Sequence, residues 1–213
     1  MAKRSLADLG VHVSRQVRHR RRLERYCRGK YSLLLNVGCG KLIKAGWVNI
    51  DCAPHDGAFY FDALDRFPIA DNSVRHIHCE HFLEHLEFDD ACMFLKDCYR
   101  VLTQGGTLRI IVPDAERYMR AYAANETAFF QQLEHLGGTT RALRPKNMVC
   151  NQAFRMGGDH LFCWDFETLE AASKKIGFHI VRQSAINDIA NELNIDGQDW
   201  WRPVESLYVN LEK

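Results

Sequence analysis

The sequence predicts an α/β protein built on a mostly parallel sheet, and three observations support this fold class. First, residues 31–114 alternate strand-like and helix-like segments, as a parallel sheet with crossovers requires. Second, the apolar run 33–37 leads directly into a glycine turn at 38–40. Third, a short apolar run at 47–50 ends on the carboxylate of Asp51. A strand, a glycine turn and an acid at the tip of the next strand form a nucleotide-shaped pocket.

The remaining elements follow in order along the chain. The periodicity of residues 89–102 predicts a helix, which a Gly-Gly pair ends before the strand 107–112. Residues 115–160 follow that strand at the carboxyl edge of the sheet, where we expect an inserted substrate lid. The last elements are expected to be a helix, a strand and a final alternating strand, at 165–177, 178–185 and 206–212.

Composition places the chain among single-domain proteins. With 213 residues and 46% hydrophobic content, it can build one domain with its own core. It has no apolar run near 18 residues, no signal-peptide pattern and no CxxC pair among its eight cysteines. We therefore expect a soluble, cytoplasmic protein with reduced cysteines and no membrane span.

Residues 1–30 form a strongly basic arm. They carry ten Lys or Arg against two acids, whereas the rest of the chain has 18 against 25. Leu9, Val13 and Val17 repeat at four-residue spacing, which predicts a helix. Two interpretations stay open: a solvated helix packed across the acidic body, or a contact surface for an anionic partner such as nucleic acid.

The pocket at the glycine turn has little room for a pyrophosphate. A dinucleotide motif needs a third glycine, a full helix and an acid about 20 residues further on. Here Leu42 and Ile43 stand where a third glycine would fall, and only ten residues separate Gly40 from Asp51. That spacing is too short for a crossover helix. The pattern favours a nucleoside without a pyrophosphate, such as S-adenosylmethionine.

Five consecutive segments resemble the class I S-adenosylmethionine-dependent methyltransferases, of the methyltransferase type 11-like kind. The segments are NVGCG, NID, FDAL, EHFLEHL and RVLTQGGTLRIIVPD, in the family's order. The resemblance covers about residues 31–183. It implies a Rossmann-like domain at 31–213 with a seven-stranded, mostly parallel sheet, an antiparallel last strand and helices on both faces.

The resemblance also implies S-adenosylmethionine as the cofactor. The glycine turn would lie against it, Asp51 would bind the ribose hydroxyls, and the FDAL segment would hold the adenine. Asn36 is a departure, because the family often has there an acid that contacts the methionine amine. The implied cofactor-binding residues are Asn36, Gly38, Cys39, Gly40, Asp51, Asp62, Ala63, Leu64 and Glu80.

The segment His81-Phe82-Leu83-Glu84-His85 is the main candidate for chemistry. As a pattern it also describes a class of zinc peptidase, but its methyltransferase context argues against that. Glu84 and His85 are either helix-capping and packing groups or metal ligands. In the second case His81, Glu84 and His85 would share one helix face.

The metal interpretation is supported by a second resemblance. The segment DHLFCW, with His160, is similar to a later segment of the small-RNA 3′-terminal 2′-O-methyltransferases. It implies a divalent metal held by His81, Glu84, His85 and His160. Three imidazoles and one carboxylate suit Mn, Fe, Co or Zn better than Mg.

Methyl transfer from a sulfonium needs alignment of the acceptor and, for a hydroxyl, loss of its proton. We place His81, His160 and Asp114 around the transferring methyl, with His81 or His160 as general base. Asp114 follows the fifth strand and is either an acceptor for a substrate hydroxyl or the N-cap of the next helix.

The sequence contains neither the Asn/Asp-Pro-Pro-Tyr/Phe motif of base amino-methylation nor the Pro-Cys pair of cytosine carbon-5 methylation. We therefore expect O-methylation of a saccharide or another small-molecule hydroxyl. Two alternatives stay open. One is RNA 2′-O-methylation, suggested by the basic arm and the DHLFCW segment. The other is a non-catalytic, cofactor-binding partner subunit, in which Asn36 would mark a degraded site.

Overall fold

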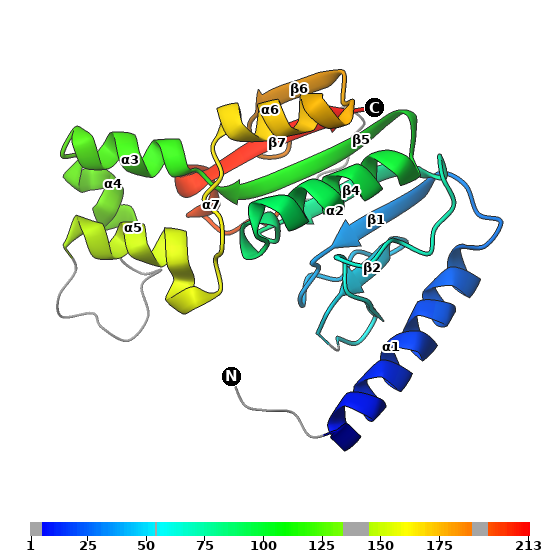
Figure 1. Ribbon diagram of the computed structural model, residues 1–213. Coiled ribbons are helices and arrows are strands. Elements are labelled where there is room, and N and C mark those ends of the chain that lie inside the picture. The colour runs from blue at the N-terminus through cyan, green and yellow to red at the C-terminus, as the bar shows by residue number, and fades with distance from the viewer. Residues whose placement is uncertain (1–5, 54, 134–144, 189–195) are drawn as a thin grey trace.

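The computed structural model describes residues 6–53, 55–133, 145–188 and 196–213 (Figure 1). One seven-stranded sheet runs through the molecule in the order β3-β2-β1-β4-β5-β7-β6. The strands are β1 (Leu33–Val37), β2 (Val48–Asp51), β3 (Phe59–Tyr60), β4 (Val74–Glu80), β5 (Leu102–Pro113), β6 (Ile180–Ser184) and β7 (Ser206–Glu212).

The strand directions confirm the predicted sheet. β1 pairs in parallel with β2 and β4, and β5 pairs in parallel with β4. The last strand, β7, lies antiparallel between β5 and β6. The glycine turn after β1 and the acid at the end of β2 therefore meet at the carboxyl edge of adjacent parallel strands, as predicted.

The helices take their bounds from local signals. They are α1 (Leu6–Cys27), α2 (Phe88–Val101), α3 (Ala115–Ala123), α4 (Thr127–Gln132), α5 (Lys146–Arg155), α6 (Phe166–Ile176) and α7 (Arg202–Glu205). Asp165 caps the start of α6 by accepting from the backbone N–H of Thr168, and Gly177 ends that helix with a φ of 127°. None of the described helices is long and apolar enough to cross a membrane.

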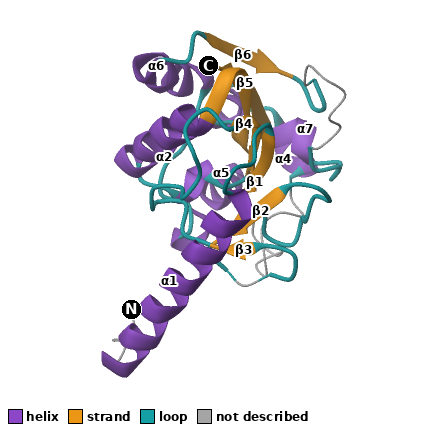
Figure 2. Ribbon diagram, turned by 90° about the vertical axis from the view of Figure 1, so that its right-hand side faces the viewer, coloured by secondary structure: helices purple, strands orange, loops and turns teal. Residues whose placement is uncertain are grey.

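One face of the sheet is apolar and carries the main core. Ile77 and Cys79 on β4 point to this face and are fully buried. The helices α2 and α6 contact each other and pack on this side (Figures 1 and 2). The helix α1 contacts β3 at the edge of the sheet, where Leu23 and Cys27 join the same core. Burial of this apolar surface is the main stabilising contribution to the fold.

The other face is polar, although it is largely buried. The strand register aligns Asn49, Asn36, His78, Arg109 and Asn210 across five neighbouring strands. Burial lowers the pKa of His78, which favours its neutral form. Buried polar groups are stable only when they find partners, so this face requires a polar cover.

In the described residues, loops provide much of this cover, together with α7, whose Arg202 pairs with Glu80 at 2.6 Å. The crossovers from β1 to β2 and from β2 to β3 are too short to contain a helix. The loop backbone supplies hydrogen bonds that a helix could not: Asn36 donates to the carbonyl of Leu42 at 2.8 Å, and Asn49 accepts from the N–H of Lys44 at 2.9 Å.

A small helical cluster stands at the carboxyl edge beyond β5. It consists of α3, α4 and α5, within the segment predicted as a lid (Figure 1). Tyr118, Phe129, Phe130 and Val149 form its own buried core. Part of the predicted lid, residues 134–144, lies outside the described residues.

Candidate active site

The segment after β4 makes a sharp change of direction. His81 has a positive φ of 48°, and only then does a single 3₁₀ turn, η1 (Leu83–His85), begin. The expectation that His81, Glu84 and His85 share one helix face is therefore wrong, because His81 precedes the helical turn. Its side chain diverges from that of His85 and contacts Trp201, with ring centroids 5.8 Å apart.

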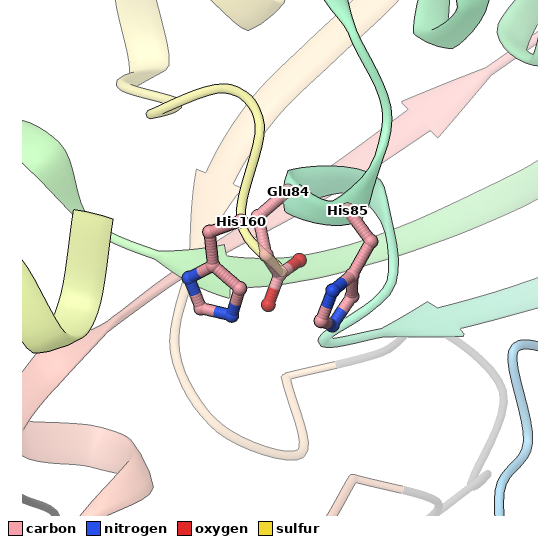
Figure 3. A group of neighbouring side chains, drawn as sticks. All are labelled: Glu84, His85 and His160. Carbon is pink, nitrogen blue, oxygen red and sulfur yellow. The ribbon is translucent and has the colours of Figure 1, made fainter. Parts of the chain in front are cut away.

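Three of the predicted ligands do come together. Glu84, His85 and His160 each offer a ligand atom within 4.8 Å of the others (Figure 3). The Glu84 carboxylate lies between the two imidazoles, and Glu84 is only 2% exposed. The Nδ1 of His81 lies 3.2 Å from its Oε1, whereas its Oε2 has no hydrogen-bond partner among the described residues. A buried carboxylate oxygen without a partner is costly, and a bound cation would remove that cost.

The two imidazoles are held in a matching orientation. The Nδ1 of His85 lies 2.9 Å from the carbonyl oxygen of Asp159, and the Nδ1 of His160 lies 2.5 Å from that of Ala153. A carbonyl can only accept, so each Nδ1–H donates and each Nε2 keeps its lone pair. Metal-ligating histidines are oriented in this way by their other nitrogen. The residues present therefore fit a divalent ion bound by two imidazoles and one carboxylate.

Backbone contacts bring the distant His160 to η1. The N–H groups of Leu161 and Phe162 both donate to the carbonyl of Glu84, at 2.8 and 3.2 Å. The indole N–H of the fully buried Trp164 donates to the carbonyl of Leu83 at 3.3 Å. The DHLFCW segment is thus joined to η1 by its backbone and anchored by Trp164.

His81 lies beside the three-residue cluster. Its Nδ1 is 3.2 Å from Oε1 of Glu84, and its Nε2 is 3.2 Å from the hydroxyl of Ser206. Burial raises the pKa of Glu84, but the neighbouring His81 outweighs it, so the pKa lies below the ordinary value of a glutamate. His81 thus favours the charged form of the Glu84 carboxylate.

A cavity of about 420 Å³ opens next to this cluster. One wall carries His81, Glu84, His85 and His160, while the helical cluster α3–α5 supplies mostly apolar side chains to the opposite wall. The volume is that of a small-molecule site. Asp114 does not line this cavity; it caps α3 by accepting from the N–H of Arg117 at 3.1 Å.

The conformation of the glycine turn lets a ligand approach its backbone closely. Gly38 and Gly40 have positive φ values of 65° and 49°. A Cβ on Gly38 would lie 2.6 Å from the ring of Phe82, so only glycine fits under this side chain. Asp51 accepts from the N–H groups of Gly40 and Ala53, both at 2.7 Å. A carboxylate has about four acceptor positions, so two stay available for ribose hydroxyls.

Other predicted cofactor residues have structural partners. Cys39 is buried next to the turn, and Asn36 holds the β1–β2 loop. Glu80 forms an ion pair with Arg202 at 2.6 Å and accepts a hydrogen bond from His78, so its carboxylate already has partners on the polar face. Asp62 accepts from the N–H of Leu64 at 3.0 Å in the turn after β3, which also contains the buried Ala63.

Sequence reasoning missed Glu205. This residue is buried at the end of α7, lines the cavity and accepts a hydrogen bond from the hydroxyl of Tyr118 at 2.5 Å. Tyr118 falls within the predicted lid, 115–160, but nothing in the sequence places Glu205 next to it.

Comparisons with known proteins agree with this fold. The methyltransferase domain family matches residues 51–110. A SAM-dependent methyltransferase from Archaeoglobus fulgidus shares 16% identity over 93% of this chain and 94% of its own, with a TM-score of 0.53. The YcgJ protein of Bacillus subtilis shares 12% identity over 92% and 98%, with a TM-score of 0.50.

A third structure is a Haloferax volcanii complex between the Trm112 methyltransferase activator and a putative methyltransferase. It shares 16% identity over 93% of this chain and 90% of the matched chain, with a TM-score of 0.50. At these identities the structures show a common fold. A search of curated proteins finds no match.

The strand order and the segment matched to the methyltransferase domain family, residues 51–110, give this chain the fold of the class I S-adenosylmethionine-dependent methyltransferases. They support methyl transfer as its activity, with S-adenosylmethionine as the methyl donor.

Proposed function

We propose that this enzyme methylates a hydroxyl group of a small molecule bound in the cavity beside Glu84. The observation that carries the proposal is the buried Glu84 carboxylate, which lies between two imidazoles and whose Oε2 has no hydrogen-bond partner among the described residues. Glu84, His85 and His160 would hold a divalent ion there. Such an ion, when bound, lowers the pKa of a hydroxyl and fixes its position. A ligand set of two His and one Glu suits Zn, Fe, Mn or Co.

The cofactor would lie at the carboxyl edge of β1 and β2. The backbone of Gly38 to Gly40 would face it, and the two remaining acceptor positions of Asp51 would take its ribose hydroxyls. The turn Asp62–Leu64 lies beyond the end of β3 on the same edge of the sheet and would contact the adenine. Phe82, which packs on Gly38, connects this region to the catalytic segment.

His81 is the proposed general base. Its imidazole lines the cavity and lies between Glu84 and Ser206. A neutral imidazole is suited to accept a hydroxyl proton near neutral pH. The orientation of His160 favours a ligand role, because its Nδ1 is used by the carbonyl of Ala153.

The test compares two glutamates that are three residues apart. Glu84→Gln keeps the shape of the buried side chain and removes its charge, whereas Glu87→Gln alters an exposed residue. The proposal predicts that Glu84→Gln and chelator treatment both abolish turnover, that metal restores only the chelated wild type, and that Glu87→Gln behaves as wild type. Full activity of a chelated, metal-free enzyme would contradict it and leave catalysis to His81 alone.

A second candidate function is methylation of an RNA hydroxyl, which the exposed face of α1 favours. Arg18, Arg21 and Arg25 follow helical spacing on one face and are exposed, while Leu23 and Cys27 are buried on the other. A row of guanidinium groups is suited to a phosphate backbone.

The arginine face is tested by binding of a fluorescent single-stranded RNA at several salt concentrations. Binding that weakens steeply with salt in wild type, and is lost when Arg18, Arg21 and Arg25 become Gln, would support the RNA function. Lys174→Gln, on the exposed side of α6, is the control. RNA binding that is equal in both variants would exclude this face as the RNA site.

A further inference from the structure

The cavity contains a second polar centre, separate from the three-residue cluster. Glu205 lines the cavity and is only 4% exposed. Its Oε2 accepts from the hydroxyl of Tyr118 at 2.5 Å, and no hydrogen bond to its Oε1 occurs among the described residues. Since Glu205 borders the cavity, the Oε1 atom is available to a molecule bound there.

This centre is rigidly placed. Tyr118 is 1% exposed and packs against the rings of Phe129 and Phe154. Burial and the neighbouring carboxylate raise the pKa of Tyr118, so its hydroxyl stays protonated and donates to Glu205. The backbone carbonyl of Glu205 also accepts from the N–H of Asp114 at 2.8 Å, which ties α7 to the end of β5. The carboxylate is therefore fixed relative to both walls of the cavity.

No cation neutralises Glu205 among the described ion pairs. Arg202, the nearest arginine in the sequence, forms ion pairs with Glu80 at 2.6 Å and with Asp199 at 3.2 Å. Burial raises the pKa of Glu205. In either protonation state, the carboxyl group can accept a hydrogen bond from a hydroxyl group bound in the cavity.

The apolar part of the cavity lining limits the rest of the ligand. Leu133, Val149, Ala153 and Met156 contribute apolar side chains to it, beside the polar Gln152. A free saccharide has hydroxyl groups around its whole ring and would leave several of them unpaired against these side chains, at a cost in binding energy.

We infer that the methyl acceptor is a small molecule with an apolar body and two hydroxyl groups. One hydroxyl is presented to Glu84, His85 and His160, and the second donates to Glu205. This inference rests on the proposed O-methylation and narrows its acceptor from hydroxyl compounds in general to apolar diols. Glu205 is then the residue that determines specificity, and Tyr118 positions it.

The test measures binding by calorimetry to the protein loaded with S-adenosylhomocysteine and metal. The probes are phenol, the three benzenediols and methyl glucoside. We expect at least one benzenediol to bind about tenfold more tightly than phenol, as expected for one added hydrogen bond. Glu205→Met should reduce that advantage to about threefold or less, and Glu205→Gln should keep part of it. Tyr118→Phe should weaken it while leaving phenol binding unchanged.

The controls separate this inference from the proposed function. Glu116→Gln changes an exposed acid on the same helix as Tyr118 and should leave every affinity unchanged. If phenol binds as tightly as all three diols, or if methyl glucoside binds best, the inference is overturned even when metal binding and turnover are intact. If a diol is preferred through Glu205 but no metal binds, the proposed metal-assisted function fails and the specificity role of Glu205 stands.

Discussion

The buried ion pair between Arg109 and Asp196 gives the sharpest test of the polar face of the sheet. Arg109 on β5 is 0% exposed, and its guanidinium meets the Asp196 carboxylate twice, at 2.5 and 3.2 Å. Asp196 also accepts from the N–H of Asn187 at 2.6 Å. Removing one partner of such a pair leaves a buried charge without compensation, which costs about 3–5 kcal/mol.

We therefore predict that Asp196→Ala lowers the free energy of unfolding in urea by about 3–5 kcal/mol. The control is Asp188→Ala, because Asp188 pairs with Arg182 at 3.1 Å on the surface, with about half of each side chain exposed. That change should cost about 1 kcal/mol or less. If Asp196→Ala lowers the free energy of unfolding by less than about 1 kcal/mol, the buried ion pair does not hold the loop 196–201 to the sheet.

Three further predictions concern single groups. Burial lowers the pKa of His76 to about 3, so folding opposes its protonation. The contribution of His76 to stability should be constant above about pH 6.5 and fall as the pH drops from there towards 3. In urea titrations, His76→Gln should flatten this fall, and the control His179→Gln, at an exposed residue, should leave it unchanged. Asp114→Ala should cost about 0.5–2 kcal/mol of stability through loss of the α3 cap and leave kcat unchanged; a large loss of kcat in a folded variant would restore its catalytic role. Gly38→Ala should displace Phe82 and weaken S-adenosylhomocysteine binding in calorimetry, and unchanged affinity would place the cofactor elsewhere.

The core of the fold was predictable because its signals are local. The apolar run of β1, the glycine turn and the acid ending β2 are contiguous in sequence, and their order fixes the parallel edge at which Gly38 and Asp51 meet. The alternation in Ser206–Glu212 similarly predicted the last strand. In each case the residue pattern of one short segment predicts its structure.

The polar face was not predicted, because its contacts form between residues on different strands. His78, Arg109 and Asn210 are far apart in the sequence and become neighbours only through the register of β4, β5 and β7. Each of them looks like an ordinary polar residue in its own strand. This face pairs with the loop backbone and with charged side chains of the segments that cover it.

The candidate site was predictable in part. The resemblance of the segments with Glu84, His85 and His160 to the small-RNA 2′-O-methyltransferases implied four ligands, and three of these residues come together. The position of His81 was misjudged because a 3₁₀ turn replaces the expected helix. Glu205 was missed because only the packing of α7 against α3 brings it to Tyr118.

The central claim is that Glu84, His85 and His160 bind a divalent ion. The most direct measurement is anomalous X-ray diffraction at the cobalt edge from crystals grown with Co²⁺. The account predicts an anomalous peak about 2.0–2.2 Å from Nε2 of His85, Nε2 of His160 and an oxygen of Glu84, and no peak there in Glu84→Gln. Crystals of the wild-type protein with no peak among these three side chains would contradict it.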